Sequence, residues 1–208
     1  MTLRAVNLGL PKSGTTTLAK ALRLSGMVVA DHRLRGRNTK DPSKKGRYVA
    51  DLLYRAYFDT GDPAALMPEV TAISEMSMMH KDRCAWPQTD FALIRAIRAH
   101  HPGVRFLASR REAFAMSQSM LAWSNLGTDR LPTGAVPGLP AGFGETSKER
   151  ERWIDGHYGN LREWFAGDPD FLEFDIADPE APNRISAFLG VDLPWWGTAN
   201  ANPLRRTS

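Results

Sequence analysis

The stretch "VNLGLPKSGTTTLAKAL", residues 6–22, decides the fold of this chain. It begins with an apolar run, continues through a turn that holds two glycines, and ends in a segment rich in alanine and leucine. The apolar run indicates a strand, and the last segment indicates a helix. We therefore expect a strand over residues 3–10, a phosphate-binding turn, and a helix over residues 13–24.

Strands and helices alternate along the rest of the chain. Apolar runs predict further strands at residues 27–30, 69–74, 104–109 and 171–176. Helical spacing of apolar residues predicts helices at residues 47–59, 89–101, 111–123, 147–165 and 180–190. This alternation predicts an α/β fold, a single domain over residues 1–208 with a mostly parallel sheet flanked by helices. Ligands of such a sheet bind at the carboxyl ends of the strands.

Composition narrows the class of protein. The 208 residues, 42% of them hydrophobic, are enough for one substantial core. The single cysteine, Cys84, excludes an internal disulfide framework, and no Cys/His spacing indicates a zinc site. No apolar run approaches the roughly 18 residues of a membrane span, and Arg4 interrupts the first one. We expect a soluble, cytoplasmic protein with no membrane partner and no bound metal.

The positive charge is concentrated in one stretch. The chain carries +4 in all, whereas residues 32–47 alone carry +6, which leaves −2 for the remainder. This stretch is either a solvated loop or a region that attracts an anionic ligand or substrate. Nucleic acid is not favoured as a partner, because aromatic residues are not interleaved with the basic ones. The basic residues are Arg33, Arg35, Arg37, Lys40, Lys44, Lys45 and Arg47, and the one acid among them is Asp41.

The glycine-rich turn departs from the loop of ATP- and GTP-binding enzymes. That loop reads G-x-x-x-x-G-K-[ST], and its lysine reaches the terminal phosphates while the next hydroxyl binds magnesium. Here Gly9 and Gly14 keep the interval, but Thr15 stands in place of the lysine and Lys12 lies inside the loop. Backbone N–H groups at the start of the helix still form an anion site. The sequence therefore predicts a nucleotide whose 5′ group needs no metal clamp.

The segment "LPKSGTTTL" resembles the 5′-phosphosulfate loop of the sulfotransferases that use 3′-phosphoadenosine 5′-phosphosulfate (PAPS), P-K-[ST]-G-T-[TS]-x-[LW]. The match is nearly letter for letter. The resemblance implies that this loop and the first turn of the following helix bind the cofactor. The residues concerned are Pro11, Lys12, Ser13, Gly14, Thr15, Thr16 and Thr17.

A second signature of the same family lies after a later strand. It places an arginine before a helix and a serine eight positions further on, and both contact the 3′-phosphate. "VRFLASRREAFAMSQSML" is similar, with Arg111 and Ser119 at that spacing. Arg110 and Ser117 offer another register, and the choice between the two pairs stays open. Ala113 stands where the family has a proline, a departure from the pattern. The end of the chain, "FLGVDLPWWGTANANP", is similar to the "FLG-x-x-x-P" close of many family members.

The resemblance also implies a chemistry and therefore candidate catalytic residues. Sulfuryl transfer moves SO₃ in line from a bridging oxygen to a hydroxyl or amine, so the protein must position the reactants and neutralise the leaving oxygen. Lys12 is the candidate for neutralisation. Either Glu75 or His32 is the candidate base, since each follows an expected strand. Small and apolar neighbours that raise a carboxyl pKa favour Glu75.

Two further segments have more than one interpretation. Met76, Met78, Met79 and Trp86 follow the candidate base, either as ordinary core or as the wall of an acceptor site. Residues 125–146 are rich in Gly and Pro, and a loop of that length is usually functional or mobile.

Together these features predict a PAPS-dependent sulfotransferase that acts without a metal on a small-molecule or glycan acceptor. One alternative is a magnesium-dependent kinase with a P-loop fold. Another is a module that binds a nucleotide without catalysis. The sequence specifies neither the acceptor nor the oligomeric state.

Overall fold

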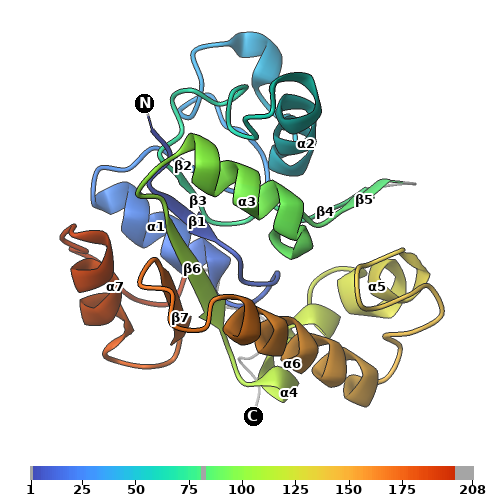
Figure 1. The fold of residues 1–208 in the computed structure, drawn as a ribbon. Coiled ribbons are helices and arrows are strands. Elements are labelled where there is room, and N and C mark those ends of the chain that lie inside the picture. Colours follow the sequence, from blue (N-terminus) through green and yellow to red (C-terminus); the bar gives the residue numbers. More distant parts are fainter. Residues whose placement is uncertain (1, 81–82, 200–208) are drawn as a thin grey trace.

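The protein is described by a computed structural model that covers residues 2–80 and 83–199. Its centre is a five-stranded parallel sheet with strand order β2-β3-β1-β6-β7 (Figure 1). The expected α/β class is therefore confirmed. The strands are β1 (Ala5–Asn7), β2 (Val29–Ala30), β3 (Ala72–Ile73), β6 (Arg105–Arg110) and β7 (Phe171–Asp175).

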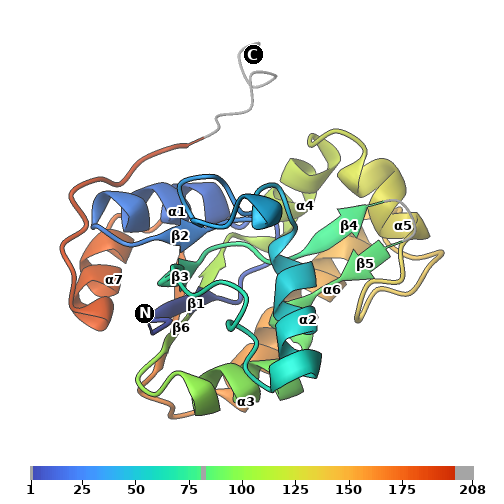
Figure 2. The same cartoon turned by 90° about the horizontal axis from the view of Figure 1, so that it is seen from above.

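Helices cover both faces of the sheet (Figures 1 and 2). One face packs against α1 (Thr15–Leu24) and α7 (Ala181–Leu189). The other packs against α2 (Val49–Thr60), α3 (Phe91–His100), α4 (Ala113–Leu121) and α6 (Ser147–Trp164). Successive strand residues alternate between the two cores, as Phe106 and Leu107 do on β6. Both faces are buried, so the strands appear in the sequence as continuous apolar runs.

The connections from two neighbouring strands leave on opposite faces of the sheet. From β1 the chain passes to α1 on one face, whereas from β6 it passes to α4 on the other. This reversal creates a crevice at the carboxyl ends of β1 and β6, the usual ligand position in an open α/β sheet. The glycine-rich loop and Arg111 both lie beside it.

Asn7 joins three strands at this edge. Its side-chain amide donates to the Ser74 carbonyl at 2.9 Å and to Ser109 Oγ at 3.0 Å. Its Oδ1 accepts from the N–H groups of Ser109, at 2.9 Å, and Gly9, at 3.3 Å. The side chain is buried, so these bonds satisfy both its own polar atoms and the main chain where the strands end.

Several strands are shorter than the sequence predicts. β1 ends at Asn7 instead of residue 10, because the chain then turns into the loop and the Leu10 N–H bonds to the Tyr158 hydroxyl. β3 has two residues where six were expected. The helices agree to within about two residues, although α4 begins at Ala113 because the Glu112 side chain caps it.

Several short elements were not predicted. An antiparallel hairpin, β4 (Met78–His80) and β5 (Arg83–Ala85), follows Glu75. The Gly/Pro-rich loop contains a π-helical turn, η3 (Leu126–Arg130), and a short α5 (Leu131–Thr133). Buried Arg150 donates to the carbonyls of Gly144 and Glu145, at 2.7 and 2.8 Å, and so ties the end of this loop to α6.

Across residues 2–80 and 83–199, no helix combines the length and the apolar character needed to cross a bilayer. The last residues of the "FLG-x-x-x-P" segment quoted above, 200–203, lie outside the described residues.

We expect Asn7→Ala to lower the free energy of unfolding by about 2 kcal/mol, because it leaves buried N–H and C=O groups without partners. Urea unfolding followed by circular dichroism measures this. The matched control is Asn160→Ala on the exposed side of α6, with a change within about 0.5 kcal/mol. Equal midpoints for the two variants would contradict the role given to Asn7.

Candidate functional site

The loop between β1 and α1 requires glycine at positions 9 and 14. A Cβ on Gly9 would lie 2.4 Å from the Ser109 carbonyl oxygen, so the loop packs directly on β6. Gly14 has φ +104°, and a Cβ there would lie 2.4 Å from Ile176 Cγ1. Lys12 also has a positive φ, 74°, which is uncommon for a residue with a side chain. The loop is thus a strained, closely packed turn, as functional loops often are.

The first turn of α1 is open to an anion. Gly14 occupies the N-cap position, no side chain caps the helix, and the first turn contains no acidic residue. The first N–H groups of a helix have no acceptor within it, and the helix dipole places partial positive charge there. Thr16 is exposed at this end, whereas Thr15 is buried. The geometry is that of a phosphate- or sulfate-binding helix terminus.

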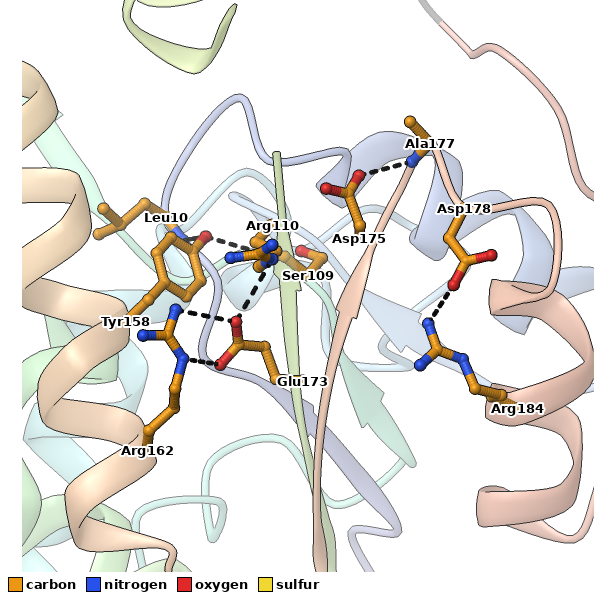
Figure 3. A network of polar contacts seen from close by, with 10 residues as sticks. All are labelled: Leu10, Ser109, Arg110, Tyr158, Arg162, Glu173, Asp175, Ala177, Asp178 and Arg184. Carbon is orange, nitrogen blue, oxygen red and sulfur yellow. Dashed lines mark hydrogen bonds and ion pairs between the residues drawn. The ribbon is translucent and has the colours of Figure 1, made fainter. Parts of the chain in front are cut away.

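Side chains from α6 hold the loop in place. The Tyr158 hydroxyl donates to the Ser109 carbonyl at 2.6 Å and accepts from the Leu10 N–H at 3.3 Å (Figure 3). His157 Nε2 lies 2.9 Å from the Leu8 carbonyl. Burial lowers the pKa of His157 to about 4, so the ring is neutral at pH 7 and Nε2–H donates to that carbonyl.

Serine hydroxyls form a second link between the loop and β6. Ser13 Oγ lies 2.7 Å from Ser109 Oγ, and both side chains are fully buried. Sequence reasoning had assigned Ser13 to the cofactor, but it missed Ser109, Tyr158 and His157. The helical pattern of α6 showed only that His157 and Tyr158 face the core, and nothing in it indicated hydrogen bonds to a loop about 150 residues away.

Lys12 shares an environment with two other charged groups. Partial burial lowers the pKa of its ammonium, the positive charge of Arg111 lowers it further, and Glu75 partly offsets both. The ammonium lies 3.7 Å from the ring centroid of Trp123, whose side chain is 48% exposed. The structure therefore brings together Lys12, Glu75 and Arg111, which are widely separated in the sequence.

Glu75 lies two residues after the end of β3 and is 9% exposed. Burial raises the pKa of its carboxyl, although hydrogen bonds from Ser77 and from the Thr15 side chain oppose the rise. The Ser77 N–H donates to Glu75 Oε1 at 3.0 Å, and the Ser77 hydroxyl donates to the same oxygen. The contact with Thr15 joins this carboxyl to the first turn of α1.

His32 approaches the same residue, Ser77, from β2. Its Nδ1 lies 3.1 Å from the Ser77 carbonyl oxygen, and the residue is exposed at the rim. Loss of water around part of the ring lowers the pKa of His32, and the charges of Arg33 and Arg130 add to this, while the bond to Ser77 opposes it. Ser77 thus links the two candidate bases.

The two registers of the second signature differ in their surroundings. Arg110 Nε lies 3.4 Å from Glu173, which also pairs with Arg162 at 2.8 Å (Figure 3). Ser117 is fully buried, accepts from Arg150 Nε at 2.9 Å and lies 3.1 Å from Ser147 Oγ.

The other pair, Arg111 and Ser119, is less deeply set. Both side chains are half-buried, and Arg111 influences the charge of Lys12 in the crevice.

Thr17, predicted to bind the cofactor, has a different neighbour. Its buried hydroxyl donates to the Gly197 carbonyl at 3.1 Å and accepts from the Ala199 N–H at 3.3 Å. Pro11 is half-buried within the loop. A shallow hollow of about 430 Å³ lies next to the crevice, at the carboxyl end of β7. Its lining alternates basic and acidic side chains around Phe174: Arg110, Arg162, Glu173, Asp175, Asp178 and Arg184.

In the part of the chain that the structure describes, no cluster of three or more His, Cys, Asp or Glu side chains is placed to hold a metal ion. No protein-family model matches this chain, and no curated protein matches it either. The case for a function therefore depends on the residues of the crevice.

We expect the pKa of Lys12 to rise in Arg111→Ala, because one of the charges that lowers it is removed, and to fall in Glu75→Gln. A pH titration of ¹³C-labelled lysine side chains by NMR measures both shifts. Arg95→Ala, at an exposed position on α3, is the control. If neither variant moved the Lys12 resonance, the three groups would not form one site.

Proposed function

We propose that this protein is a PAPS-dependent sulfotransferase with a P-loop-like sulfotransferase architecture. The observation that carries the proposal is the convergence of Lys12, Arg111 and Glu75 at an uncapped helix terminus in the crevice between β1 and β6. An uncapped terminus with two cations suits an anionic nucleotide, and the nearby carboxyl suits proton removal.

The cofactor would be held at its two anionic ends. N–H groups of residues 14–16 would hold the 5′ group, with Thr15 and Thr16 near it, whereas the Ser13 N–H, also expected there, donates to the Leu10 carbonyl at 3.2 Å. Arg111 and Ser119 would hold the 3′-phosphate. This register is supported by the engagement of Arg110 with Glu173 and by the burial of Ser117 against Arg150. Thr17 would support the site through its bonds to the carboxyl-terminal segment instead of touching the cofactor.

PAPS would supply the sulfuryl group. Lys12 would neutralise the negative charge that develops on the bridging phosphate oxygen when its bond to sulfur breaks, the role that magnesium has in other P-loop enzymes. Glu75 would accept the proton that the acceptor hydroxyl or amine loses as its new bond to sulfur forms. The products would be 3′-phosphoadenosine 5′-phosphate (PAP) and the sulfated acceptor.

Glu75 is the stronger of the two candidate bases. It is buried, its pKa is raised, and it touches Thr15 beside the proposed 5′ group. A raised pKa makes a carboxylate a better proton acceptor near neutral pH. His32, at the rim, would act either by contacting the acceptor or by its hydrogen bond to Ser77.

One contact favours the magnesium-dependent kinase alternative. P-loop enzymes hold magnesium with a loop hydroxyl and a carboxylate, and the Thr15–Glu75 contact is such a pair, although Thr16 and not Thr15 is at the position of the magnesium-binding hydroxyl. Against it, Thr15 stands where the phosphate-binding lysine would be, and Lys12 is displaced into the loop.

Calorimetric titration distinguishes these functions. We expect PAP to bind without metal and ATP with magnesium to bind at least tenfold more weakly. The reverse preference would replace the proposal with a kinase, and binding of neither nucleotide would refute both.

Lys12→Ala should reduce the rate of PAP formation from PAPS by about 10²–10³-fold, with a much smaller loss of PAP affinity, because the ammonium acts mainly on charge that develops during transfer. A panel of sugar and phenol acceptors, with PAP measured by chromatography, provides the assay. Lys20→Ala, at an exposed position on α1, is the control. Unchanged turnover would remove the role of Lys12, and PAP binding without turnover in the unmodified protein would indicate a non-catalytic module.

The pH profile of kcat/KM tests the base. Glu75 must be deprotonated to accept a proton, so activity should fall as the pH drops through its pKa, which burial raises from the ordinary glutamate value. Glu75→Gln should abolish this limb together with most of the rate, while His32→Asn should retain it. Wild-type rates in both variants would exclude both residues.

A further inference from the structure

The segment that contains most of the positive charge is an ordered loop. This basic loop, residues 31–48, follows β2 at the edge of the sheet (Figures 1 and 2). Its two arms pair, since Leu34 N–H donates to the Arg47 carbonyl at 2.9 Å and Gly46 N–H donates to the Leu34 carbonyl at 2.8 Å. Buried Asn38 donates to the Val29 carbonyl at 2.8 Å. The loop therefore presents its side chains from a fixed backbone.

Much of the charge on the basic loop is not neutralised. Lys44 pairs with Asp41 at 3.5 Å, but within residues 2–80 and 83–199 no ion pair involves Arg37, Lys45 or Arg47, all of which are exposed.

Asp31 is outnumbered by cations. It lies 3.8 Å from Arg23 and 3.7 Å from Arg35, and the charge of Arg37 also acts on Arg23. Two guanidinium groups thus share a single carboxylate and a third lies close enough to act on Arg23, which leaves a surplus of positive charge near the end of β2.

The positive surface continues to the candidate acceptor side of the crevice. The guanidinium of Arg33 lies 3.9 Å from the ring centroid of Tyr48, and the Tyr48 ring lies 5.0 Å from that of His32. Arg130, from η3, acts on His32 as well, and its Nε is buried with no hydrogen-bond acceptor among the described residues. Arginines from two separate elements therefore flank His32. The His32 ring is hydrogen-bonded to Ser77, which in turn donates to Glu75.

The apolar interpretation of this side is not supported. Met76, Met78 and Trp86 are 1%, 2% and 2% exposed and belong to the core, and half-buried Met79 packs against the same core, so the four form no open apolar wall for an acceptor. The exposed groups near His32 are mainly cationic, so a polar acceptor with negative charges fits them best.

We infer that the acceptor of the proposed sulfotransferase is an acidic carbohydrate, whose carboxylate or sulfate groups bind Arg33, Arg130 and the basic loop. The inference rests on the proposed function. The cations come from three separate elements, with Arg23 on α1, the basic loop, and Arg130 on η3, which are more groups than one small anion can pair with, and a glycan repeats both its anions and its hydroxyls along the chain. RNA is disfavoured because Arg33 covers one face of the Tyr48 ring, and no other aromatic residue is interleaved with the basic residues of the loop as a stacking platform would require.

Calorimetry on the PAP-saturated protein tests this with hexagalacturonate and neutral maltohexaose, which have the same length. We expect hexagalacturonate to bind and maltohexaose to bind at least tenfold more weakly. Arg33→Ser and Arg130→Ser should each weaken hexagalacturonate binding by about tenfold, as expected for the loss of a charged hydrogen bond. Lys45→Ser and Arg47→Ser remove exposed charges that have no ion pair among the described residues, and they test whether the basic loop itself contributes to hexagalacturonate binding. Arg95→Ser is the matched control.

Equal binding of the two saccharides would overturn the inference, as would wild-type affinity in the Arg33 and Arg130 variants. Tighter binding of an aspartate-flanked tyrosine peptide or of an oligoribonucleotide would replace the carbohydrate with that class. If PAP binds but hexagalacturonate does not, the inference alone is wrong. If PAP itself does not bind, the proposed function is wrong and the inference with it.

Discussion

The site depends on how the ends of β1, β3 and β6 are tied together. Asn7 bonds to Ser74 and Ser109, and it also accepts from the first glycine N–H of the loop. With this edge fixed, Gly9 can lie against the main chain of β6, where even a Cβ would clash. The loop is held open because its polar groups are bonded to β6 and α6, which leaves the first turn of α1 without a cap. Donors that a protein does not satisfy itself are available to a ligand.

The ionisation of the charged groups in the crevice depends on burial as much as on neighbouring charges. Burial acts in opposite directions on Lys12 and Glu75, since it disfavours the charged form of each. The pKa of the ammonium falls and that of the carboxyl rises, so both pKa values lie closer to neutral pH than they would in water. Arg111 strengthens the effect on Lys12, and the hydroxyls of Ser77 and Thr15 limit the effect on Glu75. A crevice of this kind supports charge neutralisation at one side and proton transfer at the other.

The two sides of the crevice differ in character. Toward β6 and β7 the basic side chains are matched by acids, as in the Arg110–Glu173–Arg162 group. Toward β2 the cations exceed the acids, and the loop that holds them is internally bonded. This asymmetry suggests separate tasks for the two sides: a site of defined geometry for one ligand, and an attractive surface for a more varied one.

The sequence by itself determined the α/β class, the parallel sheet, the positions of the main helices to within about two residues, and the loop that would bind an anion. These follow from local patterns: apolar runs, helical spacing and the glycine turn. It did not determine strand lengths, the β4–β5 hairpin, or the burial of Met76 and Met78, because these depend on what packs against each segment. Only the tertiary structure decided that Lys12, Glu75 and Arg111 share one crevice, that Ser117 is occupied by Arg150, and that Tyr158 and His157 hold the loop. Such contacts join residues that are up to about 150 positions apart, and they arise from the order of strands in the sheet, which local patterns do not encode.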